Sequence, residues 1–186
     1  MEDTTPARNA VLAAMQWAVR LPVMPAVSPL GEEDLMAFCA LNQIEAKLHR
    51  LSVDTPTVPA AAAAVGTAPE RIVKSLVFLA DGEPLLVIAA GESRISYPLL
   101  AGALSVSRKR LRFASPDEAL LITGYRVGAM PPFGHRVQLP TWLDANTVPA
   151  TGTVFAGGGG LNALLELDAS DLDDVTSAGR TELTRP

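Results

Sequence analysis

Cysteine and histidine are scarce in this sequence, so the metal centres and disulfides that they build are not expected. Among 186 residues there are one cysteine and two histidines. One thiol cannot form an internal disulfide, and so few ligands give no cluster with zinc-ligand spacing. Because Cys39 also falls at an apolar helical position, we expect a reducing compartment, the cytoplasm by default, and no metal site.

Long apolar runs are also missing. No stretch reaches the roughly eighteen apolar residues that a membrane-spanning helix needs. The chain opens with Glu2 and Asp3 instead of a basic region, and the apolar stretch that follows is interrupted by Arg20, Pro22 and Pro25. This pattern argues against a signal peptide. We therefore expect neither a transmembrane span nor a membrane partner.

Positive charge is limited too. The formal net charge is -5, although 48% of the residues are hydrophobic and can build a substantial core. A broadly basic nucleic-acid surface is therefore not expected, and we predict no DNA binding. One local exception is the run "RKRLR", which we predict to contact RNA phosphates, although a solvated charged strand is nearly as well favoured. Its cations are Arg108, Lys109, Arg110 and Arg112.

The common catalytic motifs are absent. "GESRI" at 91–95 begins like a nucleophile elbow, but Ile95 stands where the closing glycine should be. "GGGG" at 157–160 fits neither the dinucleotide fingerprint nor a phosphate loop. Its spacing favours a flexible turn between strands, and the alternative is a place where the backbone approaches a ligand closely, at Gly158 and Gly159.

The pattern of apolar residues, caps and turn residues predicts one domain at 28–180, preceded by an extension or linker at 1–27 and followed by a tail at 181–186. Helices and strands are interspersed, with a hairpin around Asp81 and Gly82 and closely spaced late strands, so a mixed sheet is favoured over a purely parallel one. Apolar spacing from Leu35 to Leu48 predicts one helix after Ser28. Further helices are expected at 57–66, 96–104, 115–124 and 168–175, and strands at 74–80, 83–90, 110–113, 141–145, 153–157 and 163–167.

Two local features remain. Lys74, followed by Ser75 in "RIVKSLVF", is one of three lysines and sits at the mouth of an apolar strand; on local grounds a solvated strand end is favoured. In "GYRVGAMPPFGH" at 124–135, glycines and prolines fix a loop whose amides could face an anion or a carbonyl oxygen, with Met130 and Phe133 as apolar walls. A rigid surface connection explains that loop equally well, and the lone His135 is more often incidental.

Taken together, these segments resemble the YbaK and prolyl-tRNA synthetase editing-domain family of aminoacyl-tRNA deacylases over residues 28–175. The family's strand-opening lysine matches Lys74, and its Gly-x-x-x-Pro loop matches residues 128–132, with Phe133 and Gly134 continuing the pattern. The resemblance implies an α/β fold with a compact mixed, mostly antiparallel, barrel-like sheet surrounded by helices. The sequence departs from the family at Thr57, Ala129 and Pro131, where a histidine, a glycine and a small polar residue are frequent.

The resemblance also implies an activity: hydrolysis of the ester of a mischarged tRNA without a metal or cofactor. Such an ester is already activated, so hydrolysis needs water or a ribose hydroxyl to assist attack, and donors aimed at the developing oxyanion, more than it needs a strong protein nucleophile. Apolar synthetase pockets discriminate poorly between small amino acids, which makes a second hydrolytic pocket useful. The expected partners are the acceptor end of an aminoacyl-tRNA and an aminoacyl-tRNA synthetase.

On this basis we assign a catalytic role to Lys74 and Gly128, with the substrate as the partner of a lysine that is otherwise unpaired. Lys74→Ala is then expected to fold at least as stably as the parent. The residues expected to bind substrate are Ser75, Ala129, Met130, Pro131, Pro132, Phe133, Gly134, His135, Gly158 and Gly159. A non-catalytic module that binds a tRNA end, an aminoacyl compound or a protein is the alternative, and a structural interaction protein ranks third. The amino acid, the tRNA and the oligomeric state stay open.

Overall fold

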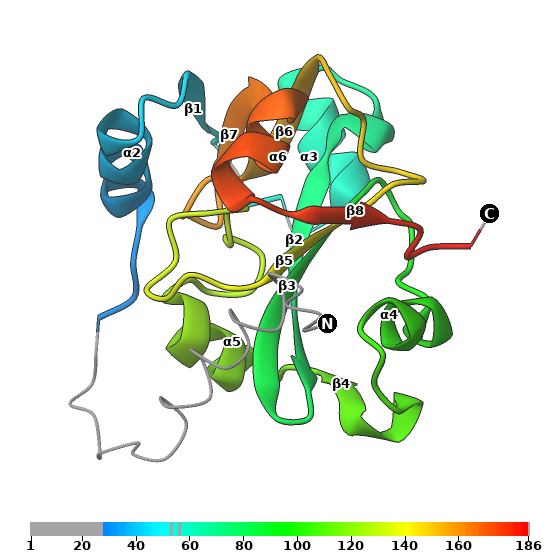
Figure 1. Ribbon diagram of the computed structural model, residues 1–186. Helices are drawn as coiled ribbons and strands as arrows, with labels where there is room; N and C mark the ends of the chain where they lie inside the picture. The colour runs from blue at the N-terminus through cyan, green and yellow to red at the C-terminus, as the bar shows by residue number, and fades with distance from the viewer. Residues whose placement is uncertain (1–27, 53, 56, 186) are drawn as a thin grey trace.

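Eight strands form two sheets in the computed structural model, which describes residues 28–52, 54, 55 and 57–185 (Figure 1). The predicted N-terminal extension at 1–27 lies outside the described residues. The strands are β1 Ala46–Arg50, β2 Val73–Ala80, β3 Glu83–Ala90, β4 Leu111–Phe113, β5 Thr141–Asp144, β6 Thr153–Gly157, β7 Ala163–Asp168 and β8 Gly179–Thr181.

The smaller sheet has the order β1-β7-β6 and is antiparallel throughout. The larger has the order β4-β2-β3-β5-β8, in which β5 runs parallel to β3 and β8 parallel to β5. A parallel bridge between Ile72 and Phe155 links the two. The prediction of a mixed, mostly antiparallel α/β fold is therefore confirmed, with the strands divided between two sheets.

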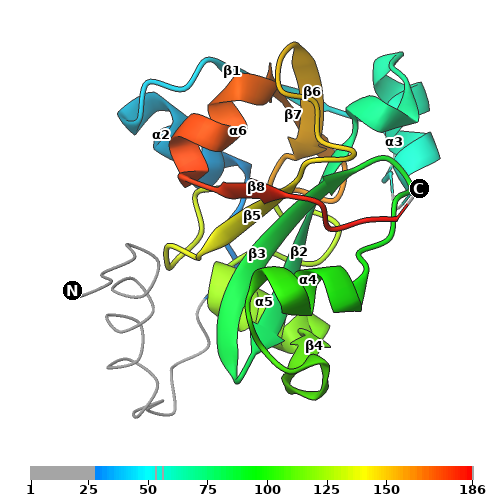
Figure 2. The same cartoon turned by 45° about the vertical axis from the view of Figure 1, so that its right-hand side comes forward.

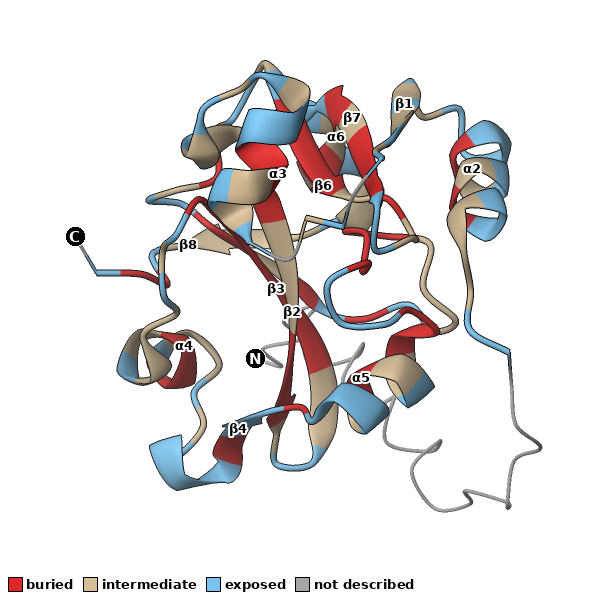
Figure 3. Ribbon diagram, turned by 180° about the vertical axis from the view of Figure 1, so that it is seen from behind, coloured by how far each residue is buried: buried red, intermediate tan, exposed pale blue. Residues whose placement is uncertain are grey.

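Short helices surround the sheets. In Figures 1 and 2, α2, α3 and α6 accompany the smaller sheet, whereas α4 and α5 lie towards the hairpin end of β2 and β3. Buried residues follow β2, β3, β6 and β7, and the helices keep exposed outer faces (Figure 3). The helical segments are α2 Glu32–Leu41, α3 Val58–Val65, η1 Pro69–Arg71, α4 Tyr97–Ala103, η2 Arg108–Arg110, α5 Pro116–Thr123 and α6 Ala169–Thr176.

Local sequence signals explain several of these helices. The Thr57 hydroxyl accepts a hydrogen bond from the Ala60 amide and begins α3, which ends at Gly66 in the left-handed conformation. Ser115 and Glu118 form a reciprocal capping box at the start of α5. The predicted bounds of both helices are confirmed, and Thr57 has a structural use in place of the family's histidine.

The predicted long first helix is wrong beyond Leu41. Helix α2 ends there, Gln43 adopts a positive φ of 57°, and residues 46–50 form β1, paired with β7. Ile44 and Leu48 continue a helical spacing, but Leu48 belongs to a strand whose partner lies more than a hundred residues away, opposite Leu165. Tertiary pairing overrides the local pattern here.

Residues 179–184 pack against the rest of the fold. Strand β8 adds an edge to the larger sheet, and Leu183 has 0% of its surface exposed. Thr184 pairs with Ile95 in an antiparallel bridge. Among the described residues, no helix has the length and apolar character needed to cross a membrane.

Candidate functional site

Lys74 lies near the start of β2 and is held by two backbone carbonyls. Its ammonium donates hydrogen bonds to the carbonyl oxygens of Gly91, at 2.8 Å, and Ser93, at 2.5 Å. Both belong to the loop after β3, which the β2–β3 pairing brings alongside because Lys74 is opposite Ala89. An ammonium has three donors, so two carbonyls leave one donor for another acceptor.

The electrostatic setting of Lys74 differs from the predicted one. The side chain is half-buried, and burial lowers its pKa from the ordinary 10.5, while the Glu92 carboxylate raises the pKa and Arg94 lowers it. The expectation that only a substrate could partner this lysine is wrong, because Gly91 and Ser93 already do so in the free protein. The loop therefore positions a partly desolvated cation in advance.

The Gly-x-x-x-Pro loop is fixed through one of its own carbonyls. The Pro131 carbonyl oxygen accepts hydrogen bonds from the Ser75 hydroxyl and from Nε2 of His135, each at 2.9 Å. Since a carbonyl can only accept, the His135 ring carries its proton on Nε2. Burial lowers the pKa of His135 to about 4, although the hydrogen bond to Pro131 opposes the shift, so the ring is neutral near pH 7.

The glycine run packs against this loop. The Gly159 amide donates to the Ala129 carbonyl at 2.9 Å, and a Cβ atom on Gly157 would stand 2.7 Å from the carbonyl carbon of Met130. The predicted flexible turn is thus a close contact between two backbones. A substrate contact at Gly158 and Gly159 stays a prediction.

Four amides of the loop at 128–134, those of Gly128, Met130, Phe133 and Gly134, donate to no described residue. The Ala129 amide donates to the Arg126 carbonyl at 3.0 Å, and the two prolines have no N–H. Within the described part of the chain, no acceptor binds the amides of Gly128 or Met130. Gly128 also has a φ of 92°, which favours glycine at this position.

The structure brings most of the predicted site residues to one end of β2. Lys74 and Ser75 are consecutive, so their side chains leave opposite faces of the strand: Lys74 meets the loop after β3, and Ser75 meets Pro131. Strand β6 enters beside this end, parallel to β2 at the Ile72 to Phe155 bridge, and finishes at Gly157. Three loops thus converge where β2 begins.

Residues 52–175 match the family model described as the aminoacyl-tRNA editing domain. The chain belongs to this family. An uncharacterized protein of Bacillus subtilis, YwhH, is 30% identical over 133 residues, covering 71% of this chain and 82% of that protein. The proline–tRNA ligase of Nitratidesulfovibrio vulgaris strain DP4 is 31% identical over an alignment of 121 residues, and the match covers 55% of this chain but 21% of the ligase.

A solved structure has the same fold. It is described as "a putative trans-editing enzyme for prolyl tRNA synthetase" and shares 28% identity with this editing domain, with a TM-score of 0.75. The match covers 83% of this chain and 97% of that one. The resemblance to the YbaK-like editing domains is therefore confirmed for both family and fold.

The predicted RNA-binding patch of the editing domain lies away from these loops. Arg112 pairs with Leu79, five residues along β2 from Lys74, or about 16 Å at 3.3 Å per residue. Three of its four cations already have partners within the protein: Arg110 pairs with Asp81, Arg112 binds Glu118, and the Arg108 guanidinium lies 4.0 Å above the Tyr97 ring. Lys109 forms no ion pair with any described residue.

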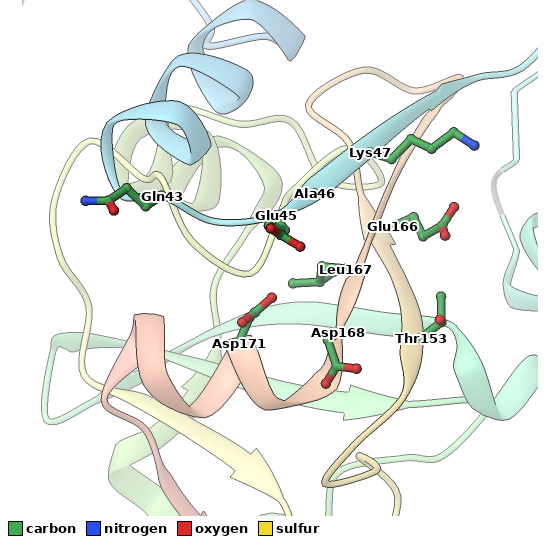
Figure 4. Close-up of a pocket in the computed structure, with 9 residues that line it drawn as sticks. All are labelled: Gln43, Glu45, Ala46, Lys47, Thr153, Glu166, Leu167, Asp168 and Asp171. Carbon is green, nitrogen blue, oxygen red and sulfur yellow. The ribbon is translucent and has the colours of Figure 1, made fainter.

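Another surface of the editing domain is an acidic groove between β1, β7 and α6 (Figure 4). Glu45, Asp168 and Asp171 gather there, and burial together with these neighbouring carboxylates raises the pKa of Asp171. Thr153 in the groove starts β6, whereas Gly157 ends that strand at the loops, so the groove is at the far end of the sheet. The described residues contain no group of three or more ligands suited to a metal ion.

Sequence reasoning missed Gly91, Ser93 and Gly157. The first two act through carbonyl oxygens, which every residue has, so no residue type marks them. Gly157 could have been found, because four consecutive glycines are a signal of close backbone approach. At Gly157 the approach is to the backbone of Met130.

Proposed function

We propose that this editing domain is a trans-acting deacylase that hydrolyses the ester between a wrong amino acid and its tRNA in the cytoplasm. The observation that carries the proposal is the ammonium of Lys74, held with a free donor at the end of β2 where the Gly-x-x-x-Pro loop is anchored. Family membership supplies the reaction class. The neighbour's description as an editing enzyme supports action on a free aminoacyl-tRNA.

The chemistry fits these donors. Attack on the ester carbonyl places negative charge on its oxygen, and preorganised N–H groups stabilise that charge. The unengaged amides of Gly128 and Met130 are suited to this oxygen, while Lys74 binds the terminal nucleotide or the reacting group. Water, assisted by a ribose hydroxyl of the substrate, is the nucleophile, so the protein has to orient and stabilise more than to attack.

The proposed substrate is a tRNA that carries a small wrong amino acid. The similarity to two proline–tRNA ligases of N. vulgaris makes proline tRNA the first candidate and a prolyl-tRNA synthetase the proposed contact. Small amino acids are expected because a synthetase pocket built for a larger residue cannot exclude them strongly.

The test is to incubate the purified protein with a panel of aminoacylated tRNAs and to follow ester loss. Proline tRNA bearing alanine, serine, cysteine or proline forms the first set, and other tRNAs with the same amino acids form the second. We expect faster loss for at least one mischarged species and no acceleration for the correctly charged one. If no species is hydrolysed faster than in buffer, the protein is better described as a non-catalytic module that binds a tRNA end, an aminoacyl compound or a protein.

A further inference from the structure

Asp144, the last residue of β5, is a buried carboxylate with no use in the proposed reaction. Its exposed fraction is 0%, and no described cation forms an ion pair with it. It accepts four hydrogen bonds: from the Leu183 amide at 2.7 Å, the Thr184 amide at 3.1 Å, the Thr184 hydroxyl at 2.7 Å and the Thr147 hydroxyl at 2.6 Å.

A buried charge without a counter-ion is costly unless every lone pair is bound. Burial alone raises the pKa of Asp144, but the four hydrogen bonds together hold it below its ordinary value. The carboxylate is therefore charged in the native protein and ties together segments that are far apart in the sequence. These segments lead to Lys74 from two directions.

The first connection runs through Thr147. Its hydroxyl donates to Asp144 and accepts a hydrogen bond from the Ala90 amide at 3.1 Å. Ala90 is the last residue of β3 and directly precedes Gly91, whose carbonyl binds the Lys74 ammonium. Asp144 thus fixes the beginning of the loop that holds the lysine.

The second connection runs through the C-terminal residues. Asp144 binds the amides of Leu183 and Thr184; the Leu183 carbonyl accepts from the Ser96 amide at 2.7 Å, and Thr184 forms a bridge with Ile95. Ile95 is the last residue of the loop at 91–95, two residues after Ser93, and Ser96 directly follows it. Both ends of the loop are therefore fixed by one carboxylate.

We infer that Asp144 is a positioning residue for Lys74, acting through the loop at 91–95 and through the C-terminal residues 183 and 184. The loop supplies the two carbonyls that orient the ammonium, and Asp144 holds the loop at its two ends. The positioning is a property of the free protein. Only its effect on catalysis rests on the proposed function.

A test that needs no activity uses the reactivity of the lysine side chains. The chain has three lysines, Lys47, Lys74 and Lys109, so acetylation by an N-hydroxysuccinimide ester can be followed for each by peptide mass spectrometry. In Thr147→Val, which removes the hydroxyl that joins Asp144 to the loop, we expect acetylation of Lys74 to accelerate by about fivefold, the factor for one hydrogen bond. Lys47 and Lys109 should react as in the parent.

Thr153→Val is the matched control, because Thr153 is exposed at the start of β6 and its hydroxyl bonds no described residue. Thermal melts establish that each variant is folded at the assay temperature. If Thr147→Val is unfolded there, Thr184→Val takes its place. An unchanged Lys74 acetylation rate in a folded variant overturns the inference. If acetylation of Lys74 accelerates but the protein has no deacylase activity, the inference about Asp144 is supported and only the proposed function is refuted.

Where a hydrolysed tRNA is found, a double-mutant cycle tests the catalytic consequence. Thr147→Val should lower the single-turnover deacylation rate at saturating tRNA about fivefold, with an unchanged Kd. The factor is the same as for acetylation, but there the rate rises. In the Lys74→Ala background the same substitution should have no further effect, because the residue through which it acts is gone. An equal loss in both backgrounds is the result of general structural damage and overturns the inference.

Discussion

Gly157 lies directly against Met130, and a side chain at this position would force the backbone to shift. A Cβ atom added to Gly157 would stand 2.7 Å from the Met130 carbonyl carbon, and the atoms it would meet belong to backbone. Backbone cannot swing aside as a long side chain does. The glycine run therefore sets how closely β6 supports the Gly-x-x-x-Pro loop, and with it where the Gly128 and Met130 amides lie.

Gly157→Ala is accordingly expected to displace the loop. The added methyl should cost about 1 to 3 kcal/mol of stability, as overpacking usually does. It should also lower the single-turnover deacylation rate by about tenfold or more, because a displacement near 1 Å misplaces donors aimed at a reacting atom. Thermal melts and single-turnover assays on the same preparations measure both effects.

Gly102→Ala provides the comparison for that variant. Gly102 is in α4, and a Cβ atom there would meet nothing within 4 Å. Helix propensity favours alanine, so this variant should be as stable as the parent or more stable, by up to about 1 kcal/mol, with an unchanged rate. If Gly157→Ala behaves like Gly102→Ala, the contact with Met130 does not position the loop.

Features encoded by neighbouring residues could be predicted from the sequence. The caps at Thr57 and Ser115 lie beside the helices that they begin, and the hairpin turn at Asp81 and Gly82 lies between the strands that it joins. Lys74 and the loop at 128–134 were recognised through a family pattern of residue types. In each case the signal is carried by side chains close together in the chain.

What could not be predicted depends on partners distant in sequence. Strand β1 forms because β7, far along the chain, pairs with it, and the Lys74 ammonium is oriented by carbonyls that no residue type marks. The basic run illustrates the same point: its composition is visible, but the pairing of Arg110 with Asp81 and of Arg112 with Glu118 follows from tertiary structure. Composition alone therefore overstates the free positive charge.

His135 should make stability depend on pH. Its pKa is about 4 in the folded protein, whereas an exposed histidine in the unfolded chain has the ordinary 6.5. Between these values the unfolded state binds more protons, so the free energy of unfolding falls as the pH falls from 6.5 towards 4. Between pH 7 and 4.5 we expect the parent to lose about 1 to 2 kcal/mol more than His135→Gln, allowing for partial burial.

Glutamine suits this comparison because its amide N–H can still donate to the Pro131 carbonyl while its side chain does not titrate in this range. Urea unfolding at a series of pH values gives the two free energies, and their difference removes the contribution of the carboxylates common to both proteins. Parallel curves for parent and variant would mean that His135 is protonated equally in the folded and unfolded states, and that its ring is not held neutral by burial.

Lys109 is the cation of the basic run to test first for RNA contact. Its three arginine neighbours have partners in Asp81, Glu118 and Tyr97, and a phosphate would have to compete with them. Lys109→Gln should therefore reduce the slope of log K for tRNA binding against log salt by about 0.7 to 0.9, one phosphate contact.

Lys47→Gln is the matched control, because Lys47 lies in the acidic groove of Figure 4 and belongs to β1, at the opposite end of the molecule from β4 in Figure 1. It should leave the slope unchanged. Equal slopes for the parent and Lys109→Gln, measured by filter binding from low to moderate salt, would remove the basic run from the model of tRNA recognition.

Lys74→Ala tests the functional proposal itself. The earlier expectation of equal or greater stability changes with the structure, because the substitution removes two hydrogen bonds and leaves the Gly91 and Ser93 carbonyls without their donor. The relief of desolvating an ammonium opposes this loss, so we expect a modest destabilisation of about 1 kcal/mol. The deacylation rate should fall about 100-fold or more, as for the loss of one electrostatic donor in a water-poor site.

Lys74→Arg separates charge from geometry. Arginine keeps the cation, but its planar guanidinium cannot place three donors as an ammonium does between the Gly91 and Ser93 carbonyls and a substrate. We therefore expect Lys74→Arg to remain well below the parent rate, although its stability is close to that of the parent. Single-turnover assays on the tRNA found active in the panel decide the matter, with folding verified by thermal melts. A rate for folded Lys74→Ala within about threefold of the parent, far short of the loss expected for such a donor, would make Lys74 a structural anchor for the 91–95 loop and leave the reaction to other groups.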